Sequence, residues 1–235
     1  MTETKARILG MIPAKGGSTR LARKNVATLG GKSLLEWTVD VARDCGLMDR
    51  LVLSTEDHGI ADVGRELGLD VPFLRPDHLA RDPAGVDDVA MHMVTELEKT
   101  GDHFDEMIYL LPTCPFRGAE DILAGYQLFK QTKADYLISV AEFEHTPFAA
   151  LSVGYDYQLN PIFPEHFGKK SQNMPLAVRP NGAFHIFKVD AFKKAGTSYP
   201  PGVVGYQMSR ERSIDIDTTL DLALAEAMLA RGPVK

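Results

Sequence analysis

Residues 12–25 read IPAKGGSTRLARKN, and this stretch decides the fold of the chain. A short apolar run over residues 8–12 leads into it and predicts a buried strand. Gly16 and Gly17 let the backbone after that strand bend and approach a ligand closely, and successive N–H groups of such a loop can hold an anion. The loop also carries four cations, which are Lys15, Arg20, Arg23 and Lys24. Together these features favour a nucleoside triphosphate site over the alternative, a solvated basic turn after an edge strand.

Length, charge and cysteine content limit the classes of protein to consider. The chain has 235 residues, which suits a single domain over residues 1–235, and its net charge of −6 argues against nucleic acid or an anionic membrane as a main partner. No apolar run approaches the roughly 20 residues that a membrane-spanning helix needs. The two cysteines, Cys45 and Cys114, are too few for a disulfide framework. These observations predict a cytoplasmic protein.

Apolar segments alternate with helical patterns along most of the chain. Strands are expected at 8–12, 51–53, 71–74, 107–111, 136–140 and 183–187. Helices are expected at 34–45, with Ser33 as N-cap, and at 60–67, 86–97, 122–129 and 220–229. This alternation predicts an α/β fold with three layers and a mainly parallel sheet. Ligands of such sheets bind at the carboxyl ends of strands, which is where the glycine loop begins.

Residues 142–179 break this rhythm. The segment has no clear periodicity and contains four prolines and six aromatic residues, Phe143, Phe148, Tyr155, Tyr157, Phe163 and Phe167. A loop of this length is usually functional or engaged with a partner, and exposed apolar surface usually marks an interface. We therefore expect an arm that pairs two copies as a homodimer, the commonest oligomer. The alternative is an arm that folds back on its own domain.

Residues 213–218, with the sequence SIDIDT, form the second strong signal. Residues two apart in an extended chain share a face, so Asp215 and Asp217 are expected to point the same way while Ile214 and Ile216 are buried. Two carboxylates suit Mg²⁺ bound to phosphate oxygens, with Mn²⁺ as a second candidate. The alternative makes Asp217 an ordinary helix N-cap and Asp215 a solvated residue. The triphosphate-type loop favours metal binding.

The pattern of the glycine loop resembles the signature of the acylneuraminate cytidylyltransferases, also called CMP-sialic acid synthetases. That family shows Ile-Pro-Ala-Arg at the start of the loop and Lys-Asn at its end, and Lys15 stands here in place of the arginine. Further segments match in order over nearly the whole chain. They are Ser54-Thr55-Glu56-Asp57, Arg75-Pro76, Leu79-Ala80-Arg81-Asp82, residues 110–117 (LLPTCPFR), Arg179-Pro180-Asn181-Gly182-Ala183 and residues 215–222 (DIDTTLDL).

The resemblance implies a nucleotide-diphospho-sugar transferase-like, Rossmann-like fold with a dimerisation arm at 142–179. It also implies transfer of CMP from CTP to the anomeric hydroxyl of a 2-keto-3-deoxy sugar acid, with release of pyrophosphate. The implied nucleotide-binding residues are Ala14, Lys15, Gly16, Gly17, Ser18, Lys24, Asn25, Asp82 and Arg75, which would read the cytosine. The implied sugar-binding residues are Leu111, Thr113, Arg179, Asn181 and His185. The implied catalytic residues are Lys15, Lys24, Asp215 and Asp217, the last two as metal ligands.

The departures from the family pattern fall mostly on the sugar side. Leu111 replaces a glutamine that helps hold the sugar acid, and His185 stands where sialic-acid enzymes often carry tyrosine. A polar group replaced by leucine usually changes what a pocket accepts. These changes favour a legionaminic- or pseudaminic-like acid at least as well as N-acetylneuraminic acid. Two alternatives stay open: a nucleotidyltransferase for another base or sugar, such as 3-deoxy-manno-octulosonate, and a catalytically weak nucleotide-binding homologue.

Overall fold

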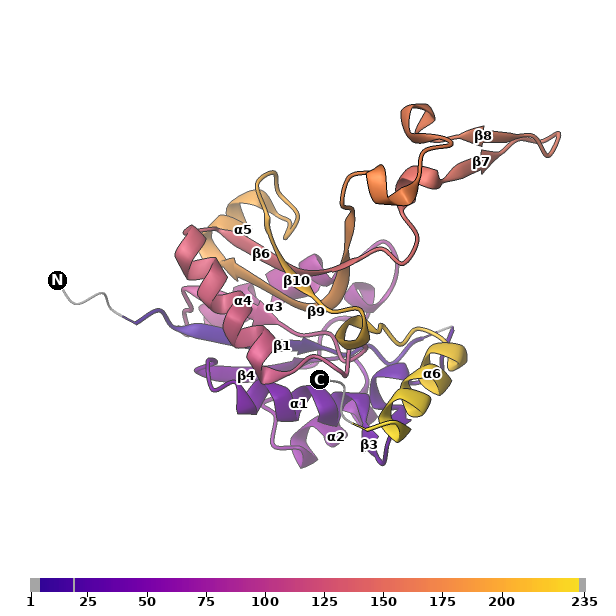
Figure 1. The fold of residues 1–235 in the computed structure, drawn as a ribbon. Coiled ribbons are helices and arrows are strands. Elements are labelled where there is room, and N and C mark those ends of the chain that lie inside the picture. Colours follow the sequence, from indigo (N-terminus) through magenta and orange to yellow (C-terminus); the bar gives the residue numbers. More distant parts are fainter. Residues whose placement is uncertain (1–4, 19, 233–235) are drawn as a thin grey trace.

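The computed structural model describes residues 5–18 and 20–232, and its centre is a six-stranded sheet in the order β10-β6-β9-β5-β1-β4. The strands are β1 (Ile8–Pro13), β4 (Arg50–Ser54), β5 (Glu106–Tyr109), β6 (Tyr136–Glu142), β9 (Val178–Lys188) and β10 (Val204–Met208). β9 runs antiparallel to β5 and β6, whereas the pairs β1–β4, β1–β5 and β6–β10 are parallel. The predicted α/β fold with a mainly parallel sheet is confirmed (Figure 1).

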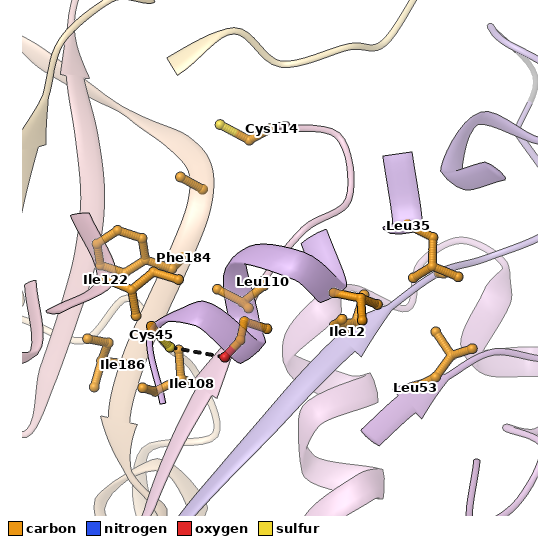
Figure 2. Close-up of a cluster of buried hydrophobic side chains, with 14 of the residues drawn as sticks. Ile12, Leu35, Cys45, Leu53, Ile108, Leu110, Cys114, Ile122, Phe184 and Ile186 are labelled. Atoms are coloured by element: carbon orange, nitrogen blue, oxygen red, sulfur yellow. Dashed lines mark hydrogen bonds between the residues drawn. The ribbon is translucent and has the colours of Figure 1, made fainter. Parts of the chain in front are cut away.

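Helices cover both faces of this sheet and make the three expected layers. They are α1 (Leu34–Asp44), α2 (His58–Glu66), α3 (Val86–Lys99), α4 (Ala119–Thr132), α5 (Val189–Ala195) and α6 (Thr219–Ala230). Along β1, Ile8 and Ile12 pack in one buried cluster with α1, α2 and α4, while Leu9 and Met11 pack in a second cluster with α3 and α5. Figure 2 shows the first cluster, with Leu35 of α1 and Ile122 of α4 among strand side chains. Alternate residues of β1 therefore face opposite layers.

Hydroxyl and carboxylate groups cap the helices that border the loops. Ser33 caps α1 as predicted, because its Oγ accepts the N–H of Glu36 at 3.1 Å. Asp57 caps α2 by accepting the N–H of Ile60 at 2.9 Å. The N-cap of α6 is Thr218, which forms a capping box with Asp221. Asp217 is therefore not the helix cap that the alternative reading required, and its carboxylate is available for other partners.

The structure differs from the prediction at two strands. Residues 71–74 form no strand, because Pro72 lacks an N–H, and only Asp70 pairs with Val52 in an isolated bridge. β9 begins at Val178, five residues earlier than expected. Pro180 and Gly182, whose φ is 72°, interrupt the apolar pattern there, and the pairing with β6 is irregular at the same point.

Short elements complete the fold. The helix α5, the sheet strand β10 and all the strands outside the main sheet were not predicted. A small ribbon, β2 (Thr28–Leu29) and β3 (Lys32–Ser33), packs with α6 around buried Leu29 and Ala225. The single-turn helices are η1 (Lys24–Val26), η2 (Asp77–Ala80), η3 (Pro147–Ala149), η4 (Pro164–His166), η5 (Ser171–Asn173) and η6 (Glu211–Ser213). In the part of the chain that the structure describes, no helix combines the length and apolarity needed to cross a membrane.

The segment predicted as an irregular arm contains a two-stranded hairpin, β7 (Leu151–Val153) and β8 (Leu159–Pro161). It projects from the body of the molecule in Figure 1 rather than folding back over the sheet. Within the arm, the Phe148 ring lies edge-on to Phe163 at 5.3 Å between centroids. Tyr155 and Tyr157 at the hairpin tip are almost fully exposed.

Close packing of α4 on β9 gives a test of this architecture. A Cβ added at Gly125 of α4 would lie 2.6 Å from Cε2 of the buried Phe184 ring. We expect Gly125→Ala to lower the free energy of unfolding by about 1–3 kcal/mol in urea denaturation, although alanine favours helices. The double variant Gly125→Ala/Phe184→Leu should lose less than the two single losses added together, because the smaller side chain makes room. Strict additivity would contradict the contact.

Candidate active site

A cleft of about 340 Å³ opens where the glycine loop leaves the carboxyl end of β1. Its wall brings together predicted residues from segments far apart in the sequence. They are Lys15, Lys24, Asn25, Arg75, Leu111, Thr113, Asp215 and Asp217. The position agrees with the rule that ligands of parallel sheets bind beyond the carboxyl ends of strands.

Hydrogen bonds to the turn after β4 hold the glycine loop in place. The N–H of Ala14 donates to the carbonyl of Ser54 at 2.9 Å, and the N–H of Gly16 donates to Oε1 of Glu56 at 2.8 Å. A Cβ at Gly16 would lie 2.4 Å from Oδ2 of Asp57, which explains the glycine. Nδ2 of buried Asn25 donates to the carbonyl of Lys15 at 2.9 Å and fixes the other end of the loop.

Glu56 also holds Arg75, whose side chain is almost fully buried. Oε2 of Glu56 accepts from Nε of Arg75 at 3.1 Å and from Nη2 at 2.5 Å. Burial alone would raise the pKa of Glu56, but the hydrogen bonds from Arg75 and Gly16 outweigh it and hold that pKa below its ordinary value. Glu56 was not among the predicted site residues. Its position beside Thr55 and Asp57, in the turn after a predicted strand, is the sequence feature that could have indicated its role.

Asp215 and Asp217 both lie on the cleft wall, as their spacing predicts, although residues 214–217 form an extended segment and not a strand. Ile216 between them is fully buried, and its N–H donates to the carbonyl of Thr113 at 2.8 Å. This bond fixes the extended segment against the loop after β5. It therefore turns both carboxylates toward the same cleft.

The two carboxylates have different surroundings. Lys24 donates from Nζ to Oδ1 of Asp217 at 2.5 Å, and Nη2 of Arg20 lies 2.7 Å from Oδ2. Oδ1 of Asp215 is buried and has no hydrogen-bond partner among the described residues. Burial raises the pKa of Asp215 above its ordinary value, and the neighbouring Asp217 carboxylate adds to the rise.

This pair of carboxylates fits a divalent metal that also binds phosphate. Over residues 5–18 and 20–232 there is no group of three or more histidine, cysteine, aspartate or glutamate side chains placed to hold a metal ion. Mg²⁺, however, is commonly held by one or two carboxylates, with substrate phosphates and water completing its shell. The unpartnered oxygen of Asp215 and its neighbour Asp217 meet that requirement.

A second cavity, of about 840 Å³, shares Asp215 with the cleft. Arg179, predicted to bind the sugar, lies on its wall together with Arg210, which the sequence analysis did not single out. Nη2 of Arg210 lies 2.8 Å from Oε1 of Glu144, and Leu224 of α6 gives the cavity an apolar side. Asp215 therefore lies on the walls of two cavities; the first contains Lys15, Lys24 and Arg75, and the second contains Arg179 and Arg210.

Two predicted sugar-binding residues line neither cavity. Asn181 is buried and its amide is fully engaged: Oδ1 accepts from Oγ of Ser139 at 2.6 Å, and Nδ2 donates to Oγ of Ser213 at 2.8 Å. His185 is also buried, with Nδ1 2.7 Å from the hydroxyl of Tyr109, and burial lowers its pKa to about 4. In this structure both side chains join neighbouring segments: Asn181 links β9 to β6 and to Ser213, and His185 packs on Tyr109 of β5.

The remaining predicted residues lie around the cleft. Leu111 and Thr113 come from the loop after β5, which Arg117 shapes by donating from Nη1 to the carbonyls of Leu111 and Cys114, both at 2.7 Å. Asp82 is exposed in a neighbouring depression beside His78. Gly17 has open space beside its α-carbon, so its backbone can approach a ligand.

Comparisons with known proteins agree with this geometry. A family model described as cytidylyltransferase matches residues 9–140. The CMP-N,N'-diacetyllegionaminic acid synthase of Legionella pneumophila is 32% identical over 226 residues, covering 95% of this chain and 96% of that protein. The pseudaminic acid cytidylyltransferase of Campylobacter jejuni is 28% identical over 220 residues, covering 94% and 95%.

Solved structures show the same fold at low sequence identity. A CMP:2-keto-3-deoxy-manno-octonic acid synthetase complexed with CTP superposes with a TM-score of 0.72 at 14% identity, covering 96% of this chain and 99% of the other. The 4-diphosphocytidyl-2C-methyl-D-erythritol synthase from Anaerococcus prevotii superposes with a TM-score of 0.67 at 13% identity, covering 97% and 100%. Because the family model spans more than half of the chain and relatives match along nearly all of it, this protein belongs to the cytidylyltransferase family and is a nucleotidyltransferase.

Proposed function

We propose that the enzyme transfers CMP from CTP to the anomeric hydroxyl of a 2-keto-3-deoxy sugar acid of the nonulosonic class and releases pyrophosphate. The hydroxyl oxygen forms a bond to the α-phosphorus, the bond from that phosphorus to the bridging oxygen of the β-phosphate breaks, and the hydroxyl proton is lost. One observation carries the proposal: Lys15, Lys24, Asp215 and Asp217 share one cleft wall at the glycine loop. Catalysis of such transfers rests on positioning and charge neutralisation.

The cleft residues divide naturally between the parts of CTP. Lys15, Lys24 and the loop backbone at Gly17 and Ser18 would hold the triphosphate, and Arg75 would read the cytosine with the part of its fork that Glu56 leaves free. Asp215 and Asp217 would hold Mg²⁺, or Mn²⁺ in its place. The metal would neutralise charge on the phosphates. Asn25 keeps the loop in shape through the carbonyl of Lys15.

The sugar acid would occupy the second cavity, across Asp215 from the nucleotide. Arg179 would pair with its carboxylate. The relatives named for legionaminic and pseudaminic acids favour one of these acids over N-acetylneuraminic acid. Leu111 and Thr113, predicted to bind the sugar, line the nucleotide cleft and not this cavity. Asn181 would support this cavity through Ser213, which lies on its wall, without touching the sugar.

We further propose that the chain forms one cytidylyltransferase domain over residues 1–235 and acts as a cytoplasmic homodimer joined through the arm. The exposed side chains of the hairpin support the dimer, since Tyr155, Tyr157 and Leu159 lack cover in a single copy. Cys45 and Cys114 are both buried as free thiols, which suits a reducing compartment.

A pyrophosphate-release screen tests the reaction directly. Each of the four nucleoside triphosphates is combined with legionaminic, pseudaminic, N-acetylneuraminic and 3-deoxy-manno-octulosonic acids in the presence of Mg²⁺. We expect release with CTP only, and fastest with legionaminic or pseudaminic acid. If calorimetry shows CTP binding while every acid fails to release pyrophosphate, the chain is a nucleotide-binding homologue and not this enzyme.

The carboxylate pair gives a second test. We expect Asp217→Asn to lower kcat by at least about 100-fold at saturating Mg²⁺, or about 2.7 kcal/mol, because the amide binds a metal poorly and carries no charge. Urea denaturation should show a stable fold, since Asp217 is partly exposed and Thr218 caps α6. Asp62→Asn, an exposed change on α2, serves as the control and should keep full turnover. Near-parental turnover in Asp217→Asn would exclude the metal role.

The exposed arm leads to a further prediction. We expect light scattering to give a dimer, and Tyr155→Ser/Leu159→Ser to raise the dimer dissociation constant by at least about tenfold, since each serine removes apolar area from the interface. Leu123→Ser removes a partly exposed leucine on α4 and should leave the dimer intact. A parental protein that runs as a monomer at working concentration, with full activity, would show that the arm has another use.

A further inference from the structure

Two cations of the glycine loop occupy both oxygens of Asp217 in the free protein. Lys24 takes Oδ1 and Arg20 takes Oδ2, at 2.5 and 2.7 Å. The pair Lys24–Asp217 joins positions 193 residues apart, so the contact connects the glycine loop to the extended segment that precedes α6. The side chain of Lys24 is 14% exposed and that of Arg20 is 65% exposed, and Arg20 therefore covers Asp217 from the solvent side.

This arrangement sets up a competition. A triphosphate and the Asp217 carboxylate both attract the same loop cations, and a divalent metal and those cations both attract the same carboxylate. Exposed ion pairs are worth little, about 0–1 kcal/mol, so the Arg20 pair breaks readily. A triphosphate carries several negative charges against one on the carboxylate, and the loop backbone at Gly17 is open to receive it.

We infer that Arg20 is a further positioning residue of the nucleotide site, acting through Asp217. With Lys24 it neutralises Asp217 in the free enzyme and blocks a divalent metal, and it moves to the triphosphate when nucleotide enters, which frees Asp217 for the metal. The inference rests on the proposed function and adds an order to it: the metal reaches Asp217 with the nucleotide or after it, not before.

The neighbouring Arg23 supplies a matched control. It carries the same charge in the same loop, but its backbone is left-handed, with φ of 50°, and its Nη2 lies 3.6 Å from Oδ1 of Asp57. Asp57 caps α2 and lies outside the set of residues that form the cleft wall. Loss of either arginine therefore changes the charge of the loop equally, whereas only loss of Arg20 uncovers Asp217.

The first measurement uses metal alone. Mn²⁺ is titrated into the nucleotide-free protein and its binding is followed by electron paramagnetic resonance. Arg20→Ala should bind Mn²⁺ about threefold more tightly than the parental protein, equivalent to about 0.7 kcal/mol, which is the size expected for one exposed ion pair. Arg23→Ala should match the parent, and Arg20→Ala/Asp217→Asn should lose the gain. Equal gains in the two arginine variants, or parental binding as tight as that of Arg20→Ala, would overturn the inference.

The second measurement uses nucleotide alone. CTP binding is measured by calorimetry in the presence of EDTA. Asp217→Asn should bind CTP at least about threefold more tightly than the parent, because Lys24 and Arg20 no longer have to break an ion pair with a carboxylate before they meet the triphosphate. The same variant still loses turnover. Asp215→Asn, which removes a carboxylate from the same cleft wall, should gain less. Weaker or unchanged binding in Asp217→Asn would overturn the inference. If the parent binds no CTP with or without metal, the proposed function fails, and the Mn²⁺ comparison still decides the role of Arg20.

Discussion

One carboxylate holds the nucleotide side of the site together. Glu56 accepts the Gly16 N–H with one oxygen and the Arg75 guanidinium with the other, so the turn after β4 sets both the path of the glycine loop and the direction of the arginine. Arg75 is buried, and leaving a buried charge without its partner is costly. The loop that would meet the phosphates and the side chain that would meet the base are thus fixed relative to each other by a single residue.

Much of the framework was predictable from the sequence because strands and helices each space their hydrophobic residues in their own way. The strand β1 and the helix α1 with its Ser33 cap were found from alternation, helical spacing and a capping hydroxyl. β9 was found only in part, because Pro180 and Gly182 interrupt the apolar run where the strand bulges against β6. β10 lies at the edge of the sheet with alternate residues exposed, so its apolar signal is weak.

The site was predictable where residues lie next to each other in the sequence, and less so where the fold brings distant side chains together. Asp215 and Asp217 share a face because two-residue spacing in an extended chain requires it. Asn181 lies within a family motif, but its amide is used up by Ser139 and Ser213, partners 42 and 32 positions away. The same holds for Glu56, whose partners Gly16 and Arg75 become visible only once β1 and β4 are paired.

The balance of charge explains how an acidic chain can present a site for a polyanion. The net charge is −6, yet the glycine loop concentrates four cations, and two of them pair with the single carboxylate of Asp217. An internal carboxylate thus partners these loop cations and lies where a phosphate-bound metal would need it. Asp215 completes the arrangement because it lies on the walls of both cavities, and its buried Oδ1 has no hydrogen-bond partner among the described residues. A buried polar atom of this kind is costly unless a partner satisfies it, and this one lies where the two proposed substrates would meet.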